Sequence, residues 1–391
     1  MPNPRDCSAI LGYCTNVHAG VTFDETLANL ERHAVAVRQR FSPDEPMGVG
    51  LWLSAAAARR VLDDGRVDEL RDWLDAHGLF VFTLNGFPFG DFHEPRVKHR
   101  VYEPDWADPR RLAYTLDLAR ILAALLPEHG EGSISTLPIG WPAMMDSHDG
   151  KRDAAKQLLD LVHHLARLEL DTGRLIHVDL EPEPGCVLGT SEQAVAYFHK
   201  HLLGHADDAS VKSYLRICHD ICHAAVMFED QGEALRRYDD AGLLVGKVQV
   251  SSALRITFDE MTPRDRDAAL RMLRGFAEDR YLHQTCVRDG TGVVRFFEDL
   301  PEALASVGGG EARGEWRVHF HVPIYLDSFA LIGTTRSAIE ACLPEALARG
   351  VRAFEAETYA WPVLPAALRV DDLADGIARE LAWLRAQVVG P

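Results

Sequence analysis

Short apolar runs alternate with longer amphipathic runs along almost the whole chain. The short runs are rich in Val, Ile, Leu and aromatic residues, which is typical of strands buried on both faces. The predicted strands are residues 8–16, 47–54, 79–86, 132–140, 174–183, 214–220, 244–252 and 351–358. Between them, residues 26–41, 108–126 and 154–170 repeat apolar positions at helical spacing.

Strands that alternate with helices pair in parallel through right-handed crossovers, and eight of them close a barrel. We therefore predict an α/β fold, a (β/α)8 TIM barrel that forms a single domain over residues 1–391. A doubly wound open sheet is the alternative. It has little support in a dinucleotide-binding form, because no G-x-G-x-x-G motif follows the first predicted strand.

Two connections are much longer than the others. One covers residues 86–109, after the third strand, and the other runs from about 253 to 350, after the seventh. The second is predicted to contain a helix at 264–277, a hairpin around 288–292 and a strand-like run at 316–325. Long loops on the carboxyl-terminal face of a barrel are usually functional, so both are expected to border a site.

Composition and charge narrow the function. The chain has 391 residues, 47% of them hydrophobic, which is ample for a large core. Lys and Arg number 41 against 59 Asp and Glu, and the net charge of −18 repels phosphate backbones, so no nucleic-acid partner is expected. The N-terminus lacks signal-peptide features, no apolar run approaches membrane-spanning length, and seven scattered cysteines fit a reducing compartment. We expect a cytoplasmic protein that does not insert into membranes.

Polar residues stand at the carboxyl end of nearly every predicted strand. A barrel brings these ends together around one axial pocket, although they are far apart in sequence. They include Ser135, Thr136, Asp179 and Ser251. The residues predicted to contact a substrate are Asn16, His18, Asn85, His93, His177 and Gln249.

Three carboxylates form the sharpest set within this ring. Glu181, Asp220 and Glu357 end the fifth, sixth and eighth strands. Together they would repel one another, and a divalent cation, Mn, Zn, Mg or Co, is the usual remedy. The alternative is that each caps a helix or pairs with a surface arginine; for three such residues together we favour the metal.

The segment H-F-H offers imidazole ligands. On a strand, alternation places His319 and His321 on one face at a spacing suited to one ion. Half-buried histidines at a sheet edge are an equal alternative, and His283 is a weaker candidate. The predicted metal ligands are Glu181, Asp220, His319, His321 and Glu357.

Other features have plainer interpretations. Cys218 and Cys222 lack a second pair at zinc-ribbon spacing and are expected to be small buried residues. The aromatic segment 87–92 either caps a ligand or packs on the barrel. Lys98 and Arg100 in the same loop either neutralise an anionic substrate group or are solvated.

The sequence D-I-C-H-A-A at 220–225 resembles the D-T-C-H-A motif of the xylose-isomerase-like barrels. That superfamily contains sugar isomerases, ketose 3-epimerases and nucleases of the endonuclease IV type. The resemblance implies a glutamate, an aspartate and a glutamate after the fifth, sixth and eighth strands, and Glu181, Asp220 and Glu357 match. The superfamily's seventh-strand histidine is replaced by Gln249 or Ser251, while H-F-H resembles the D-x-H that endonuclease IV carries beyond that strand.

A more specific resemblance covers most of the chain. It is similar to the EboE family of metabolite-traffic proteins, from the Ebo gene cluster, in the segments GYCTNVHAG, FTLNGFPFGDFH, VKHRVYEPDW, GSISTLPIGW, RVHFHVPIY and ETYAWPVLP. The resemblance implies a xylose-isomerase-like barrel that handles a secondary-metabolite precursor, with partners among other Ebo-cluster proteins. It does not imply a particular reaction.

Three functions follow from these observations. The first is a metal-dependent sugar isomerase or epimerase acting on a small polyhydroxylated metabolite. Its catalytic residues would be Glu181 and Glu357, which relay protons, and His223, which orients the substrate or assists proton transfer. The second is a non-catalytic protein that binds or transfers a metabolite. The third, a phosphodiesterase like endonuclease IV, is disfavoured by the net charge of −18.

Overall fold

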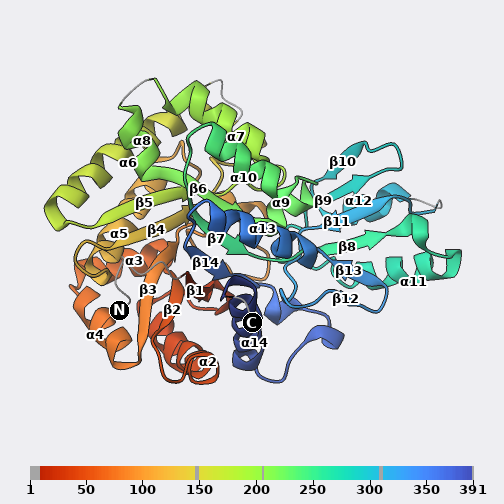
Figure 1. Ribbon diagram of the computed structural model, residues 1–391, viewed down its shortest axis with the longest axis horizontal. Coiled ribbons are helices and arrows are strands. Elements are labelled where there is room, and N and C mark those ends of the chain that lie inside the picture. The colour runs from red at the N-terminus through yellow and green to blue at the C-terminus, as the bar shows by residue number, and fades with distance from the viewer. Residues whose placement is uncertain (1–8, 146–148, 205–206, 308–310, 390–391) are drawn as a thin grey trace.

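Eight parallel strands form a closed barrel in the computed structural model, which describes residues 9–145, 149–204, 207–307 and 311–389 (Figure 1). Their spatial order is β1-β14-β7-β6-β5-β4-β3-β2. They are β1 (Ile10–Cys14), β2 (Met47–Trp52), β3 (Leu79–Asn85), β4 (Glu131–Thr136), β5 (Leu175–Leu180), β6 (Leu215–Asp220), β7 (Val245–Val250) and β14 (Ala353–Ala356). Each coincides with one predicted strand, β4 beginning one residue before its predicted start, so the predicted barrel is confirmed; residue 8 of the first predicted strand lies outside the described residues.

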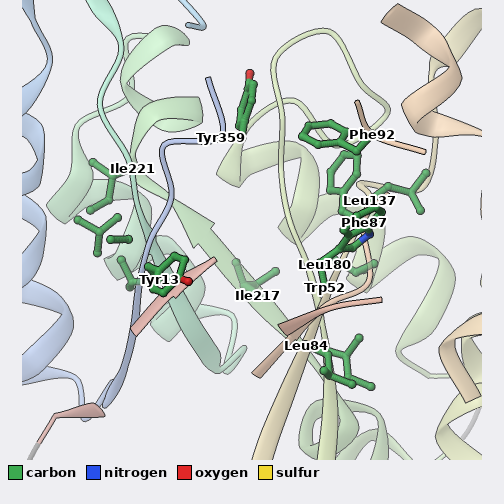
Figure 2. Packing of buried hydrophobic residues seen from close by; sticks show 14 of the residues in the cluster. Tyr13, Trp52, Leu84, Phe87, Phe92, Leu137, Leu180, Ile217, Ile221 and Tyr359 are labelled. Carbon is green, nitrogen blue, oxygen red and sulfur yellow. The ribbon is translucent and has the colours of Figure 1, made fainter. Parts of the chain in front are cut away.

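Helices follow the strands and surround the barrel (Figure 1). They are α1 (Phe23–Asn29), α2 (Val35–Phe41), α3 (Ala55–Asp63), α4 (Val67–Ala76), α5 (Pro109–Leu125), α6 (Gly150–Thr172), α7 (Ser191–Tyr197), α8 (Asp208–Tyr214), α9 (Ile221–Val226), α10 (Gln231–Asp240), α13 (Arg336–Ala348) and α14 (Leu373–Val389). Several begin at a side chain that accepts a hydrogen bond from the first turn, as Ser54 and Thr190 do. Apolar residues such as Leu84 and Ile217 are fully buried in the core (Figure 2).

The long connection after β7 contains its own antiparallel sheet, beside the barrel in Figure 1. Its elements are β8 (Leu254–Thr257), α11 (Pro263–Arg274), β9 (Thr285–Arg288), β10 (Val294–Phe297), α12 (Leu300–Val307), β11 (Glu315–Val318), β12 (Ser328–Phe329) and β13 (Ile332–Thr334). The predicted helix and hairpin are present. The predicted strand over 316–325 is too long, because β11 ends at Val318. The insertion also ends earlier than predicted, since α13 packs on α10 and α14 as a barrel helix.

The inside of the barrel carries charged residues below the strand ends. The group that we call the lower layer consists of Glu131, His177, Asp179, Arg216, Lys247 and Glu355; all are buried except Glu131, whose side chain is 53% exposed at the start of β4. Lys247 on β7 forms an ion pair with Glu355 and donates to Ser135 Oγ on β4 at 3.1 Å. Because β5 and β6 lie between β4 and β7, this bond crosses the barrel interior.

The remaining members of the lower layer are paired too. Arg216 donates to Glu131 at 2.6 Å, and the His177 ring lies 2.6 Å from an Asp179 oxygen. Gly50 is required by this packing, since a Cβ there would lie 1.4 Å from Glu355 Oε1. Each charge of the lower layer therefore has an opposite charge next to it.

Candidate functional site

Three carboxylates meet at the carboxyl end of the barrel. Glu181 follows β5, Asp220 is the last residue of β6, and Glu357 follows β14. One oxygen of each lies within 4.8 Å of one oxygen of the others, and all three residues are buried. We call them the upper layer. Parallel strands that end at one rim of a closed barrel bring them together, as the sequence predicted.

The upper layer lacks the pairing of the lower layer. Burial, followed by the charges of Glu357 and Asp220, raises the pKa of Glu181 well above its usual value. Burial, followed by the charges of Asp220 and Glu355, raises the pKa of Glu357 to about 8. Glu181 Oε2 and Asp220 Oδ2 have no hydrogen-bond partner among the described residues. Such an arrangement favours either protons or a cation between the carboxylates.

Asp220 combines the helix cap that the sequence left open with a carboxylate oxygen that has no hydrogen-bond partner among the described residues. Its Oδ1 caps α9 by accepting from the His223 backbone N–H at 2.8 Å, and it also accepts from Ser251 Oγ at 2.8 Å. Its Oδ2 has no hydrogen-bond partner within the described part of the chain. The cap orients the carboxylate and leaves one oxygen for a ligand.

The imidazoles come from the insertion and from α9. His319 and His321 follow the end of β11, so they do not share a strand face as predicted, yet their Nε2 atoms lie 3.3 Å apart. His319 Nδ1 lies 2.7 Å from Gln284 Oε1, and His321 Nδ1 lies 2.8 Å from the Glu357 carbonyl oxygen. His223 Nδ1 lies 3.0 Å from the Pro182 carbonyl oxygen.

These contacts fix the ring tautomers. Burial lowers the pKa of His223 to about 3 and that of His321 to about 4, so both rings are neutral near pH 7. A neutral ring that donates from Nδ1 to a carbonyl has a lone pair on Nε2. The two Nε2 atoms of His319 and His321 are then acceptors that face each other without a donor between them.

The donor set fits a divalent ion. Asp220, His223 and His321 have ligand atoms within 4.8 Å of one another, as do Glu183, His223 and His319. Carboxylate oxygens with facing imidazole lone pairs suit Mn, Mg, Co or Zn. The backbone carbonyls behind His223 and His321 supply the outer contacts that orient histidine ligands in metal sites.

Glu183 was not identified from the sequence. It is buried, accepts from Tyr102 Oη at 2.7 Å and from Gln284 Nε2 at 2.8 Å, and lies 3.8 Å from His319. Burial raises its pKa to about 7. The repeated glutamate in E-P-E, two residues after Glu181, was the available signal. Its partners are distant in the chain, so spacing alone does not reveal them.

Glu380 on α14 holds two loops of the site together. Its carboxylate accepts from the Ile324 backbone N–H at 3.1 Å, from Thr358 Oγ1 at 2.6 Å and from Trp361 Nε1 at 3.0 Å. Ile324 follows the H-F-H segment, while Thr358 directly follows Glu357. This buried carboxylate therefore ties the histidine loop to the end of the eighth barrel strand.

A cavity of about 560 Å³, its open mouth included, lies over these groups. Asn16 and Asn85 line it and donate to Glu357 Oε1 at 2.7 and 3.3 Å. The polar lining is Asn16, Asn85, Lys98, Tyr102, Glu181, Glu183, His223, Tyr281, His319, His321, Glu357 and Tyr359. Phe87 and Phe92 of the aromatic segment line it as well. A cavity lined by aromatic rings and a few convergent polar groups is typical of small-molecule sites.

Two residues that were predicted to contact a substrate, His93 and Gln249, do not line the cavity. His93 Nε2 lies 2.7 Å from the Asn16 carbonyl oxygen, so the ring ties the loop 86–109 to the end of β1. Gln249 is fully buried, and its amide has no hydrogen-bond partner among the described residues. Neither residue is among those that line the cavity in the described part of the chain.

Two further predictions need correction. His177 lies four residues before Glu181 on the same strand, and its place in the lower layer puts it away from the cavity. His18 turns outward to Tyr13 Oη at 3.0 Å and stacks on His33 with ring centroids 4.3 Å apart. In both cases the strand was identified correctly, but the direction or depth of the side chain was not.

The remaining candidates lie outside the carboxylate cluster, although Cys222 Sγ lies within 4.8 Å of ring nitrogens of His319 and His321. Cys218 and Cys222 are fully buried, as expected. His283 stacks on Phe320 with centroids 5.0 Å apart, outside the described metal-ligand groups. Lys98 lines the cavity but pairs with Asp299 at 2.5 Å, and Arg100 pairs with Glu94.

Comparison with solved structures identifies the fold. A xylose-isomerase-like TIM-barrel protein from Mycobacterium smegmatis, in complex with magnesium, is 12% identical, with a TM-score of 0.52 over 98% of this chain and 97% of that one. An L-ribulose 3-epimerase is 13% identical, with a TM-score of 0.50 over 98% and 95%. The chain has the xylose-isomerase-like TIM-barrel fold. A xylose isomerase domain protein from Alicyclobacillus acidocaldarius is similar too, at 11% identity and a TM-score of 0.50 over 97% and 98%.

Sequence comparisons add no closer relative. No protein-family model matches the chain, and no curated protein matches it. No helix in the described part of the chain is both long and apolar enough to cross a membrane.

Proposed function

We propose that the protein is a divalent-metal-dependent isomerase or epimerase of a small polyoxygenated metabolite. The observation that carries this proposal is the upper layer: three buried carboxylates whose oxygens lie within 4.8 Å, beside imidazoles with free Nε2 atoms. The magnesium complex and the epimerase among the similar barrels support it. A divalent ion held by Glu181, Asp220, Glu357 and His321 would polarise a substrate carbonyl.

The chain's own residues supply the proton chemistry. Glu181 and Glu357 both line the cavity and come from opposite sides of the ligand group, on β5 and β14. A carboxylate there accepts a proton from a carbon next to the carbonyl, and the second carboxyl returns one. His223 and Asn85 orient the substrate from the cavity wall.

The resemblance to the EboE family supports a proposal about the substrate, the cellular compartment and the partners. The substrate is then a secondary-metabolite precursor, the protein acts in the cytoplasm, and its partners are other Ebo-cluster proteins. The net charge of −18 favours a small-molecule partner over nucleic acid. It also weighs against the phosphodiesterase alternative, which weak or absent DNA and RNA binding at low salt would exclude.

Solvent exchange tests the proposal without a known substrate. The metal-loaded protein, with its ion identified by elemental analysis, is incubated in D₂O with a panel of small hydroxyketones and aldehydes. We expect deuterium at the carbon next to the carbonyl, detected by NMR, and loss of exchange in Glu181→Gln and Glu357→Gln. Failure to bind any divalent ion, or full exchange in both variants, contradicts the proposal.

A non-catalytic metabolite-binding protein is the second candidate. The observation that favours it is Gln249, an uncharged residue at the strand where the superfamily carries a histidine ligand. This candidate predicts ligand binding without exchange. Exchange catalysed by the wild-type protein excludes it.

A further inference from the structure

The hydrogen-bonding groups of the cavity lie mainly at its barrel end. Glu181, His223 and Glu357 lie there, and the amides of Asn16 and Asn85 are already bonded to Glu357. At the loop end, Lys98 carries a permanent charge, which Asp299 neutralises at 2.5 Å. The hydroxyls of Tyr281 and Tyr359 also line the cavity at the loop end, and Tyr281 Oη has no hydrogen-bond partner among the described residues. A fully hydroxylated substrate would therefore find fewer hydrogen-bond partners at the loop end than at the barrel end.

The loop end is closed by three aromatic rings from separate segments. Phe92 comes from the loop after β3, Tyr281 from the insertion and Tyr359 from the segment after β14. The ring centroids lie 5.0 Å apart for Phe92 and Tyr281, 5.4 Å for Phe92 and Tyr359, and 4.9 Å for Tyr281 and Tyr359. Figure 2 shows Phe92 and Tyr359 above Leu180 and Ile217, with the Tyr359 hydroxyl directed away from them.

Apolar residues continue this surface around the cavity. Val97, Val101 and Leu282 line it beside Phe87. Tyr359 lies between the loop end and the barrel end of the cavity, because its ring centroid is 4.5 Å from that of His321. A molecule held at the carboxylates would extend from the ion-binding end directly onto apolar and aromatic surface.

We propose that the substrate is amphipathic: a polyoxygenated head that chelates the ion, attached to an apolar ring or chain that packs against Phe92, Tyr281 and Leu282. This inference rests on the proposed function for the head and on the cavity walls for the remainder. Sugars that are hydroxylated along their whole length are then weaker ligands, because the Tyr281 and Tyr359 hydroxyls can replace only part of the water that their distal hydroxyls lose.

Matched chelators test the proposal. Acetohydroxamate, benzohydroxamate and a hydroxamate with a polyhydroxylated chain share one chelating head and differ in the group attached to it. With the metal-loaded protein, calorimetry is expected to give benzohydroxamate an affinity at least about tenfold above acetohydroxamate, since burying a phenyl ring contributes that much. The affinities of all three for the free ion, measured in the same buffer, are subtracted.

Single substitutions test which side chain causes the preference for benzohydroxamate. Phe92→Ala is expected to bring benzohydroxamate close to acetohydroxamate while leaving acetohydroxamate binding unchanged. Phe89→Ala is the matched control, because Phe89 is in the same loop but packs on Tyr114, with centroids 5.2 Å apart. Equal affinities for the three chelators, tighter binding of the polyhydroxylated one, or a preference that survives Phe92→Ala overturns the proposal.

An experiment without metal tests the apolar part of the site independently of the proposed metal-dependent function. In chelator-treated protein, saturation-transfer NMR is expected to detect benzyl alcohol but not glycerol, and Phe92→Ala is expected to abolish the signal. Failure to bind a divalent ion would contradict the proposed metal-dependent function, while this arm would still support or overturn the apolar half of the site.

Discussion

The two layers of charged residues inside the barrel differ in how their charges are balanced. In the lower layer the acids Glu131, Asp179 and Glu355 each contact a base, and the opposed Asp179 carboxylate helps to raise the pKa of His177 against the effect of burial. In the upper layer three acids lie together, and the neighbouring histidines have lowered pKa values. Apart from the half-exposed Glu131, the residues of both layers are buried.

This difference shows which buried charges indicate a site. A buried ion pair has its charge balanced within the protein, even where single oxygens such as Asp179 Oδ2 and Glu355 Oε1 have no hydrogen-bond partner among the described residues. A buried cluster of one sign remains costly until a ligand of the opposite sign binds. The unbalanced charge of the upper layer, rather than its burial, is therefore the argument for an ion.

The largest expected effect concerns the lower layer. Lys247→Met leaves the Glu355 carboxylate buried without its cation, which costs about 3–5 kcal/mol of unfolding free energy. Urea unfolding of the metal-free protein measures it. The double variant Lys247→Met with Glu355→Leu is expected to recover most of the loss. If Lys247→Met unfolds at the wild-type urea concentration, the pair does not balance the layer as described.

A substitution in the upper layer is expected to raise the stability of the metal-free protein rather than lower it. Glu181→Gln removes one of the crowded acids, so the metal-free protein becomes more stable by about 1 kcal/mol. Its affinity for divalent ions falls at least about 100-fold, since a ligand is lost. Calorimetric metal titration and urea unfolding measure the two effects. Glu131→Gln in the lower layer is the control and is expected to lower stability without changing metal affinity.

The pH dependence of stability is the next test of the upper layer. The pKa of Glu357 is raised from 4.5 to about 8 and that of Glu183 to about 7, so their contribution to stability is complete at low pH and is lost as the pH rises through these values. His223 and His321 have lowered pKa values, and their contribution is complete above 6.5. From pH 6.5 to 8 the metal-free protein is expected to lose about 1–2 kcal/mol.

Saturation with a divalent ion is expected to remove this loss, because the ion binds the deprotonated carboxylates. Urea midpoints across the pH range, with and without the ion, measure it. A metal-free protein whose stability is constant or rises between pH 6.5 and 8 contradicts the assignment.

The smallest effect is expected for His177→Asn. The asparagine amide can keep the hydrogen bond to Asp179, so stability falls by only about 0.5–1 kcal/mol. Metal affinity and deuterium exchange are expected to remain at wild-type values, since His177 lies in the lower layer. A marked loss of metal affinity or of deuterium exchange in this variant would show that His177 belongs to the functional site.

The sequence predicted the barrel because strand and helix periodicities are local properties. It also predicted Glu181, Asp220 and Glu357 as neighbours, because strand ends in a barrel converge whatever the exact register. It placed His177 incorrectly because alternation turns both His177 and Glu181 inward, while depth along the strand depends on where the strand ends.

The insertion part of the site was harder to predict. His319 and His321 were expected together because of a strand, yet they meet in a loop whose path is fixed by Gln284 and the Glu357 carbonyl. Glu183 depends on Tyr102 and Gln284, which are 81 and 101 residues away. Contacts of this kind leave no periodic signal in a sequence.

The position of Glu380 has a consequence for how the protein is made. The barrel carboxylates and the histidine loop precede it in the chain, and the carboxylate that ties the Ile324 and Thr358 loops together is on α14. Since chains emerge from the ribosome N-terminus first, a nascent chain that stops before α14 has all the proposed ligands but not the contact that holds the two loops. We therefore expect the ion to be acquired in its final geometry only after α14 has been synthesised and has packed.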